Sequence, residues 1–568
     1  MTTIHTHGDN LSIDWKIQQL TTIQRMLTTE QEVICHALYQ DLQKSSTEAL
    51  AMEIRPLQAE ISYFLKHLRK QQRRRWWTRK HSHSSLFTKH IPSPLLLSPI
   101  RSKLESYPLA PPGVLVIGPC NYPFALTVRP AIGSLAAGNP TVLKPNSQAC
   151  PHTSQLLERL VSKYFPTPSD NVKETDNTSP PALQVWCSPP EDAIEDTQAL
   201  MNVGWGTVFF TGSANVGKLI AQAAARTLTP TILELGGKCP TYVDDSFVTR
   251  NGTTTPSLRQ VADRIVWSKL VNAGQTCVAP DYVLVHTAAA KALQEELPKA
   301  VARQYGLLPK QQQYQSNLGR IVTTNATQRL FNLLHNVQDE ILQAHQQPLV
   351  SPAEDIYTPR VLMGGLEDSD LKDRFVAPTI LWEPPMTCRL WEEEIFGPIL
   401  PVKVVENHKE AIQWIQRISP AHPLALYVFT KHAQVFDSIR QAIPSGAAVR
   451  NDCVIHLANH HSPFGGLGVS GYGRYHGKYS LDSFTHVRPV VYRVCTPGAD
   501  FGMTRFEPMH NTLQHQIVTE GLVRLPYIPV LPIKCLVNIT VPLLLGLLLI
   551  KKVPFLRKLV LMFLTNAL

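Results

Sequence analysis

The sequence predicts an α/β fold in which parallel strands alternate with helices around a large core. Short apolar runs typical of buried strands are separated by stretches with helical spacing, which is the pattern of β-α-β units. Of the 568 residues, 43% are hydrophobic and only 17% are charged, which excludes a globally disordered chain. At about 150 residues per domain, this length predicts three to four folding units or one large enzyme with several lobes.

The predicted elements begin with helices over residues 11–75, where apolar residues recur at helical spacing. A linker rich in proline and serine follows at 91–108. The elements that alternate after it are strands at 114–117, 141–143, 183–186 and 207–210, and helices at 130–137 and 153–164. Further predicted features are surface loops at 167–181 and 251–257, a second α/β stretch at 256–430, a glycine-rich segment at 464–477 and a strand at 485–494.

The positive charge of the chain is local. Lysine and arginine number 54 against 44 acidic residues, and nine of the positive charges lie between Lys66 and Lys89, where there is no acid. This basic run is compatible with a solvated helix face or with a surface for anionic lipid. The neighbouring Trp76 and Trp77 leave nucleic-acid binding as a weaker third reading, and we expect no nucleic-acid partner.

The ten cysteines include no CxxC pair, so they do not form a disulfide framework and a reducing compartment fits best. The first twenty residues contain no apolar segment, so we expect no secretory signal peptide.

The end of the chain differs in composition from the rest. No acidic residue follows Glu520, and residues 527–550 are apolar apart from Lys534 and Asn538. As a helix, residues 535–550 would be about 24 Å long. Snorkelling by the lysines at 551 and 552 could extend it towards the ~30 Å hydrocarbon core of a bilayer. We expect a membrane anchor over 527–568, as a span or a hairpin, preceded by a linker or gating segment over 496–526. A buried C-terminal helix is the alternative.

Three residues are candidates for covalent chemistry. Cys277 lies in Asn-Ala-Gly-Gln-Thr-Cys-Val-Ala-Pro, a turn of small residues where substrate could reach a nucleophile, although most cysteines are structural. Glu234, between two leucines and before Gly-Gly, could have a raised pKa and act as a general base, or it could be a capping or ion-paired glutamate. Asn121 follows a strand and could stabilise an oxyanion, or it could be an ordinary turn residue.

A second group of residues suggests an anion-binding edge of the sheet. Lys144 follows a strand, and Thr-Gly-Ser-Ala-Asn-Val-Gly at 211–217 lies between a strand and a helix. Gly212 and Ser213 would place donors at a helix N-terminus, where a pyrophosphate is favoured. The segment does not match G-x-G-x-x-G. The segment Glu-Glu-Glu-Ile-Phe-Gly-Pro at 392–398 completes the set, and we predict no metal site.

Together and in this order, these segments resemble the aldehyde dehydrogenase superfamily over roughly residues 10–495. The segment 462–486, which contains Pro-Phe-Gly-Gly-Leu-Gly and Tyr-His-Gly-Lys, is similar to the class 3 branch, and the hydrophobic tail is similar to that of the fatty aldehyde dehydrogenases. The resemblance implies a homodimer with a Rossmann-like cofactor domain, a catalytic domain and a small bridging β-element. Its parts would be an N-terminal helical part at 1–105, the NAD(P)-binding domain at 106–235, the catalytic domain at 236–430, and a return to the cofactor domain with the bridging element at 431–495.

The resemblance also implies a role for each matching residue. Cys277 would attack the aldehyde, Asn121 and the Cys277 N–H would stabilise the oxyanion, and Glu234 would activate the water that hydrolyses the thioester. The cofactor would be NAD or NADP. Its expected contacts are the ribose-binding Lys144 and Glu394, Phe396 beside the nicotinamide ribose, and the pyrophosphate-facing Gly212, Ser213, Ala214, Asn215, Val216 and Gly217.

Three features depart from the family pattern. The family usually has tryptophan before the motif asparagine, where this chain has Cys120, so we expect more room there or a compensating side chain. Glu234 and Cys277 are unusually far apart, at 43 positions, and the loop at 251–257 would absorb the excess. Asn-Ser-Gln at 146–148 stands where many relatives have a glutamate that repels the 2′-phosphate of NADP, so we predict dual cofactor use or a bias towards NADP.

The expected function is oxidation of long-chain aldehydes to acids by an enzyme anchored to a membrane. Its catalytic part would lie in the cytosol, at the endoplasmic reticulum, a lipid droplet or the mitochondrial outer membrane. Oxidation of apocarotenal, isoprenoid or aromatic aldehydes is the alternative within the same mechanism. Two other readings are disfavoured by the residues: Glu234 argues against a CoA-acylating enzyme, and the complete residue set argues against a silent membrane scaffold.

Overall fold

The computed structural model describes residues 12–77, 89–91, 101–109, 111–166, 181–249, 254–306, 318–346, 355–419 and 422–492. The predicted gating segment at 496–526 and the membrane anchor at 527–568 lie outside these ranges, as does most of the loop at 167–181. Within the described ranges, no helix has both the length and the apolar character needed to cross a bilayer. The described residues fall into two compact units, 12–77 with 106–486, and 89–91 and 101–105 with 487–492.

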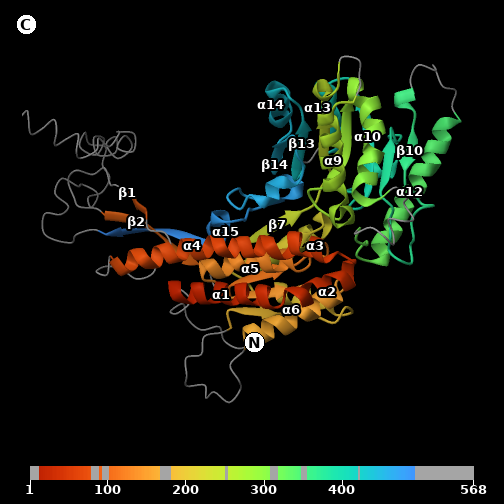
Figure 1. The fold of residues 1–568 in the computed structure, drawn as a ribbon. Helices are drawn as coiled ribbons and strands as arrows, with labels where there is room; N and C mark the ends of the chain where they lie inside the picture. The colour runs from red at the N-terminus through yellow and green to blue at the C-terminus, as the bar shows by residue number, and fades with distance from the viewer. Residues whose placement is uncertain are drawn as a thin grey trace, which may run out of the picture. The chain divides into compact units, whose positions relative to one another are not determined.

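The larger unit begins with the predicted helices. These are α1 (Ile13–Thr29), α2 (Gln31–Leu42), α3 (Ser46–Ala49), the π-helical turn η1 (Leu50–Ile54) and α4 (Arg55–Trp77). Ser12 caps α1 because its hydroxyl accepts a hydrogen bond from the Trp15 N–H. The apolar faces of α1 and α4 pack against each other and against α5 (Ala125–Ala137), as Figure 1 shows.

A six-stranded sheet follows, and it contains all four strands that the sequence predicts between residues 114 and 210. Its order is β15-β7-β6-β3-β4-β5, with β15 antiparallel to β7 and the other neighbours parallel. Because β4 lies on one side of β3 and β6 on the other, a crevice forms at the carboxyl ends of these strands. The strands are β3 (Val114–Ile117), β4 (Thr141–Lys144), β5 (Leu183–Val185), β6 (Thr207–Gly212), β7 (Thr231–Leu235) and β15 (Gly471–Tyr472), with helices α6 (Pro151–Tyr164), α7 (Ala193–Met201) and α8 (Ala214–Ala225).

The chain leaves this sheet after Leu235 and enters a seven-stranded sheet at Cys239, with the order β10-β11-β12-β9-β8-β13-β14. All neighbours are parallel except β10 and β11. The strands are β8 (Cys239–Val243), β9 (Pro280–His286), β10 (Arg360–Met363), β11 (Thr379–Trp382), β12 (Ile399–Val405), β13 (Ala425–Phe429) and β14 (Ala447–Arg450). The helices are α9 (Pro256–Leu270), α10 (Thr287–Tyr305), α12 (Thr324–His345), α13 (His408–Ile418) and α14 (Ala433–Ala442).

Two elements differ from the sequence prediction. The seven-stranded sheet extends past the expected boundary at residue 430, because α14 carries the chain back to add β14 beside β13. The predicted linker at 91–108 contains a strand, β2 (Arg101–Pro108), which pairs with β1 (Lys89–Ile91) in a small sheet of order β1-β2-β16. The third strand of this sheet, β16 (Thr485–Tyr492), follows α15 (Lys478–Ser483) and matches the predicted strand near the end of the described chain.

Candidate active site

The carboxyl ends of β3, β4, β6 and β7 line a cavity of 1310 Å³, into which the segments around Cys277 and Glu394 also project. The cavity brings together eleven of the twelve residues that the sequence singles out. The residues are Asn121, Lys144, Gly212, Ser213, Ala214, Asn215, Val216, Glu234, Cys277, Glu394 and Phe396. Glu234 and Cys277 therefore line the same cavity although 43 positions separate them in the sequence.

The remaining residue, Gly217, is not part of the cavity lining. A Cβ atom at this position would lie 2.7 Å from the Cδ2 atom of Leu235, so the glycine lets α8 approach β7 closely. The packing against Leu235 explains why this position is a glycine, and the expected contact of Gly217 with pyrophosphate stays a prediction.

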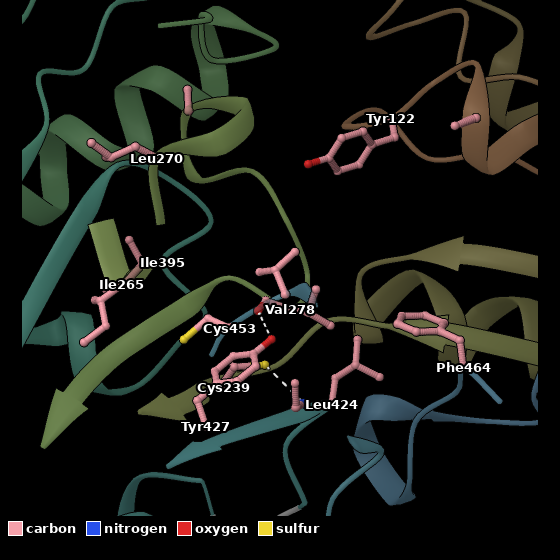
Figure 2. Close-up of a cluster of buried hydrophobic side chains, with 14 of the residues drawn as sticks. Tyr122, Cys239, Ile265, Leu270, Val278, Ile395, Leu424, Tyr427, Cys453 and Phe464 are labelled. Carbon is pink, nitrogen blue, oxygen red and sulfur yellow. Dashed lines mark hydrogen bonds between the residues drawn. The ribbon is translucent and has the colours of Figure 1, made fainter. Parts of the chain in front are cut away.

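Cys277 lies between a short helical turn, η3 (Val271–Gly274), and β9. Three consecutive residues before it, Asn272, Ala273 and Gly274, have left-handed φ angles of 55°, 53° and 76°. Such a backbone is unfavourable for residues other than glycine and persists only when its surroundings hold it. Figure 2 shows the buried side chains beside this loop, where the Tyr427 hydroxyl donates to the Val278 carbonyl oxygen at 2.5 Å.

The environment of the Cys277 thiol opposes ionisation. Burial raises the pKa of Cys277, and the negative charges of Glu394 and Glu234 raise it further. Ionisation of this thiol therefore needs a base or an added positive charge that compensates for the environment.

Glu234 lies in β7 with only 3% of its surface exposed. Neither carboxylate oxygen has a hydrogen-bond partner among the described residues, so the capping and ion-paired readings of this glutamate are wrong. Burial raises its pKa well above the ordinary value of 4.5. A carboxyl group that has a raised pKa, lines a cavity and lacks a hydrogen-bond partner among the described residues has the properties of a general base.

Asn121 follows β3 and is also buried. Its Nδ2 atom donates to the Gln275 carbonyl oxygen at 2.9 Å, and an amide nitrogen carries a second hydrogen that can reach a ligand. Cys120, beside it, lines the cavity and packs against Leu42, Cys150 and Val322.

Three structural features at the other end of the cavity, the cofactor end, suit a dinucleotide. Ser213 is the N-cap of α8, and its hydroxyl accepts a hydrogen bond from the Val216 N–H at 3.4 Å, so the first turn of α8 faces the cavity. Lys144 ends β4 and is buried; burial lowers its pKa, while the charge of Asp196 raises it. Exposed apolar side chains complete this end and suit a planar base: Ile194, Val216 and Leu219.

Ser147 adds a polar group that the sequence named only as a departure. Its hydroxyl is buried, lines the cavity and has no partner among the described residues, which fits a site for a ligand hydroxyl or phosphate. Arg226, which the sequence analysis did not propose as a ligand contact, is exposed and lines the same cavity.

The segment that carries Glu394 and Phe396 is held by cations that the sequence analysis missed. Lys238 Nζ is paired with Asp281 and donates to the carbonyl oxygens of Leu390, at 2.8 Å, and Glu393, at 2.9 Å. Arg329, on α12, donates to the Glu394 and Ile395 carbonyl oxygens. Burial and the Asp281 charge raise the pKa of Glu394 to about 8. The position of Lys238 directly after Glu234-Leu-Gly-Gly was a signal that could have been used.

Comparison with known proteins agrees with this geometry. A family described as the aldehyde dehydrogenase family matches residues 9–490. The 4,4′-diaponeurosporen-aldehyde dehydrogenase of Staphylococcus aureus is 35% identical over 481 residues, which cover 85% of this chain and 90% of that protein. Human aldehyde dehydrogenase family 3 member B1 is 35% identical over 493 residues, which cover 87% of this chain and 90% of that protein.

A solved structure described as the substrate bound state of Staphylococcus aureus AldH has the same fold, with a TM-score of 0.71 and 31% identity. The match covers 90% of this chain and 96% of that one. The family match spans the six-stranded and the seven-stranded sheet and every residue of the cavity described above. The chain therefore belongs to the aldehyde dehydrogenase family and is an NAD(P)-dependent aldehyde oxidoreductase.

Proposed function

We propose that the chain oxidises long-chain fatty aldehydes to carboxylic acids while it is attached to a membrane. The observation that carries the proposal is the C-terminal sequence at 527–568, an apolar segment flanked by lysines on a chain with an aldehyde dehydrogenase site. Fatty aldehydes partition into membranes with about 0.8 kcal/mol for each buried CH₂. Attachment would therefore place the enzyme where its substrate is concentrated.

The end of the cavity that contains Cys277, Glu234 and Asn121 is called the chemical end here. Each of these residues would have its own task in the reaction. Cys277 Sγ, once its thiol proton has passed to solvent, attacks the aldehyde carbon, and the Asn121 amide and the Cys277 N–H stabilise the oxyanion that forms. NAD(P), held by the first turn of α8 and Lys144, would supply the acceptor for the hydride that leaves this carbon, so that the adduct on Cys277 becomes a thioester. The Glu234 carboxylate takes a proton from the water that attacks the thioester; the carbon–sulfur bond then breaks, the acid leaves, and this proton passes to the sulfur and restores the thiol.

The exposed face of α4 supports attachment to an anionic leaflet. Lys66, Arg69, Lys70 and Arg73 are all exposed and recur at helical spacing on one face. Each cation near an anionic membrane surface contributes about 1 kcal/mol to attraction. We propose that this face meets the cytosolic leaflet of the endoplasmic reticulum, a lipid droplet or the mitochondrial outer membrane, and that the chain acts as a homodimer.

The cofactor end supports dual cofactor use or a bias towards NADP. Ser147 contributes a neutral hydroxyl where a carboxylate would repel a 2′-phosphate, and Arg226 contributes a positive charge to the same cavity.

A second candidate substrate is a polyene aldehyde. The Staphylococcus aureus relative is named for such a compound. Oxidation of a polyene aldehyde would use the same catalytic residues of this chain as oxidation of a fatty aldehyde.

The substrate proposal is tested with the detergent-solubilised full chain. Production of NADH and NADPH would be measured over straight-chain aldehydes from butanal to octadecanal, with an apocarotenal and an aromatic aldehyde beside them. The matched blank is Cys277→Ala. We expect kcat/KM to rise with chain length; a flat profile with highest activity on the apocarotenal would establish the second candidate instead.

Attachment is tested by extracting cell membranes with alkaline carbonate, which releases peripheral proteins. We expect the chain to stay in the membrane pellet and a Leu544→Arg, Leu548→Arg variant to be released. Release of the unaltered chain by carbonate would contradict the anchor.

A further inference from the structure

Two segments that are far apart in the sequence carry the groups that meet the substrate carbonyl, and hydrogen bonds join them directly behind these groups. The segments are 118–123, which carries Asn121, and 272–277, which ends at Cys277. The bonds run from Asn121 Nδ2 to the Gln275 carbonyl oxygen (2.9 Å), from Asn272 Nδ2 to the Asn121 carbonyl oxygen (2.8 Å), and between the hydroxyls of Tyr122 and Thr276 (2.7 Å). The orientation of the Asn121 amide towards Cys277 therefore depends on what holds these two backbones.

The N-terminal helices place a buried cation at the first segment. Lys44, which is 1% exposed, donates from Nζ to the Asn121 carbonyl oxygen at 3.3 Å and pairs with Glu53 at 2.6 Å. The second oxygen of the Glu53 carboxylate accepts from the N–H of Ala125, the first residue of α5, at 2.8 Å. Lys44 Nζ also lies 4.4 Å from the centre of the Tyr122 ring. The pair thus ties both the middle of the β3–α5 connection, at Asn121, and its end, at Ala125, to the N-terminal region.

The same helices reach the second segment through Glu48. Its carboxylate accepts from the N–H of Asn272 at 2.7 Å, at the first of the left-handed residues that lead to Cys277. Glu53 itself lies in the π-helical turn η1, and such turns occur frequently at functional sites. The N-terminal helices therefore contact the backbones of both catalytic segments with charged groups, although neither Lys44 nor Glu53 lines the cavity.

We propose that Lys44 and Glu53 are positioning residues that hold Asn121 in the orientation needed to stabilise the oxyanion beside Cys277. A buried ion pair is a poor device for stability alone, because apolar residues of similar volume often serve as well or better. Here both partners use their remaining hydrogen-bonding capacity on backbone atoms around Asn121. The proposal rests on aldehyde oxidation through Asn121 and Cys277, and it does not depend on the chain length of the aldehyde.

The test is the paired variant Lys44→Met with Glu53→Gln, assayed on the aldehyde that the unaltered chain oxidises fastest. Removing both charges avoids leaving one of them buried alone, and glutamine can still accept from the Ala125 N–H. Losing an oxyanion donor costs about 10²–10³ in kcat, and we expect a displaced donor to cost about tenfold. The KM for NAD or NADP should stay the same. The rate at which NADH or NADPH forms in the first turnover should fall, because this turnover includes the attack of Cys277 on the aldehyde.

A matched control removes another buried ion pair of the same unit, which joins α4 to α5. Arg129 on α5 pairs with Glu60 on α4, and neither contacts residues 118–123 or 272–277 in the described bonds. Arg129→Met with Glu60→Gln should leave kcat unchanged, with folding of both paired variants checked by thermal melting. A similar fall in kcat for both pairs would overturn the proposal, because it would indicate a general loss of packing.

Adding Asn121→Ala to the paired variant tests whether Lys44 and Glu53 act through Asn121 or affect kcat independently of it. If Lys44 and Glu53 act through Asn121, the paired change should lower kcat in the unaltered chain but not in the Asn121→Ala background. An equal fall in both backgrounds would overturn the proposal. An Asn121→Ala variant with full activity would instead refute the proposed role of Asn121, so the two failures are distinguishable.

A second variant covers the case in which the paired variant does not fold. Lys44→Arg keeps the charge and the ion pair, but the longer planar guanidinium places its donors differently from the lysine ammonium. We expect a lower kcat with an unchanged cofactor KM. A folded Lys44→Arg protein with unaltered kcat would overturn the proposal.

Discussion

The two ends of the cavity differ in how their side chains are held in place. At the chemical end, Cys277 follows a left-handed backbone run, and the Asn121 amide is held by the loop that it faces. Glu234 is buried and has no hydrogen-bond partner within the described part of the chain. At the cofactor end, donors come from the first turn of α8 and from strand ends, and exposed side chains such as Arg226 stand among them. The chemical end is thus fixed by interlocking contacts, so one change should abolish turnover. The cofactor end consists of separable contacts, so one change should only retune affinity.

The largest effect on turnover should come from Cys277→Ala, at the chemical end. We expect a loss of aldehyde oxidation of about 10⁴-fold or more, because removal of a nucleophile leaves only binding and electrostatic effects. Cofactor binding, followed by fluorescence, should be preserved. Cys187→Ala, at a half-buried cysteine outside the cavity lining, is the control. A variant that kept a hundredth of the activity, a barrier increase of only about 2.7 kcal/mol, would end the assignment of Cys277 as nucleophile.

The next effect in size should come from Glu234→Gln. A general base contributes about 10²–10⁴ in rate, so we expect kcat to fall by about 10²-fold while the first turnover still reduces cofactor rapidly. Because burial raises the pKa of Glu234, the rate of the unaltered chain should rise with pH well above 4.5 as the carboxylate forms. This rise should vanish in the glutamine variant. Loss of the rapid first turnover would contradict a role confined to thioester hydrolysis.

Cys277 and Glu234 could be identified from the sequence because each lies in a short motif of consecutive residues. A buried parallel strand is a continuous apolar run, and Val114–Ile117 was predicted to the residue for this reason. The strand β14 was missed because its residues are only half-buried and its apolar signal is weak. Lys44 could not be found at all, because its contact with Asn121 joins residues 77 positions apart and exists only in the folded chain.

At the cofactor end we expect a smaller effect from Ser147→Glu. A carboxylate at this buried position should lower kcat/KM with NADP by about tenfold, or ~1.4 kcal/mol, and leave the value with NAD nearly unaltered. Gln148→Glu places the same charge at an exposed neighbour, where solvent screens it, and should have less effect. Equal kcat/KM losses with both cofactors would mean that residue 147 does not distinguish them.

The smallest predicted effect concerns stability rather than turnover. Because the folded chain raises the pKa of Glu234 above its unfolded value, the contribution of this group to stability is complete at acidic pH and is lost as pH rises through the folded pKa. Glu234→Gln should therefore raise the melting temperature relative to the unaltered chain at alkaline pH and leave the difference small at acidic pH. Melting curves across this range test the sign, and a larger gain at acidic pH would contradict it.

The contact of Gly274 with Gly397 has a mechanical consequence. A Cβ atom on Gly274 would lie 2.2 Å from the Gly397 carbonyl oxygen, so the loop that leads to Cys277 touches the loop that carries Phe396 backbone to backbone. With no side chain between them to absorb movement, a displacement of one loop is transmitted to the other. The single hydrogen atom in the side-chain position of Gly274 therefore sets how close the Cys277 loop can lie to the Phe396 loop, and any side chain at residue 274 would push the two loops apart.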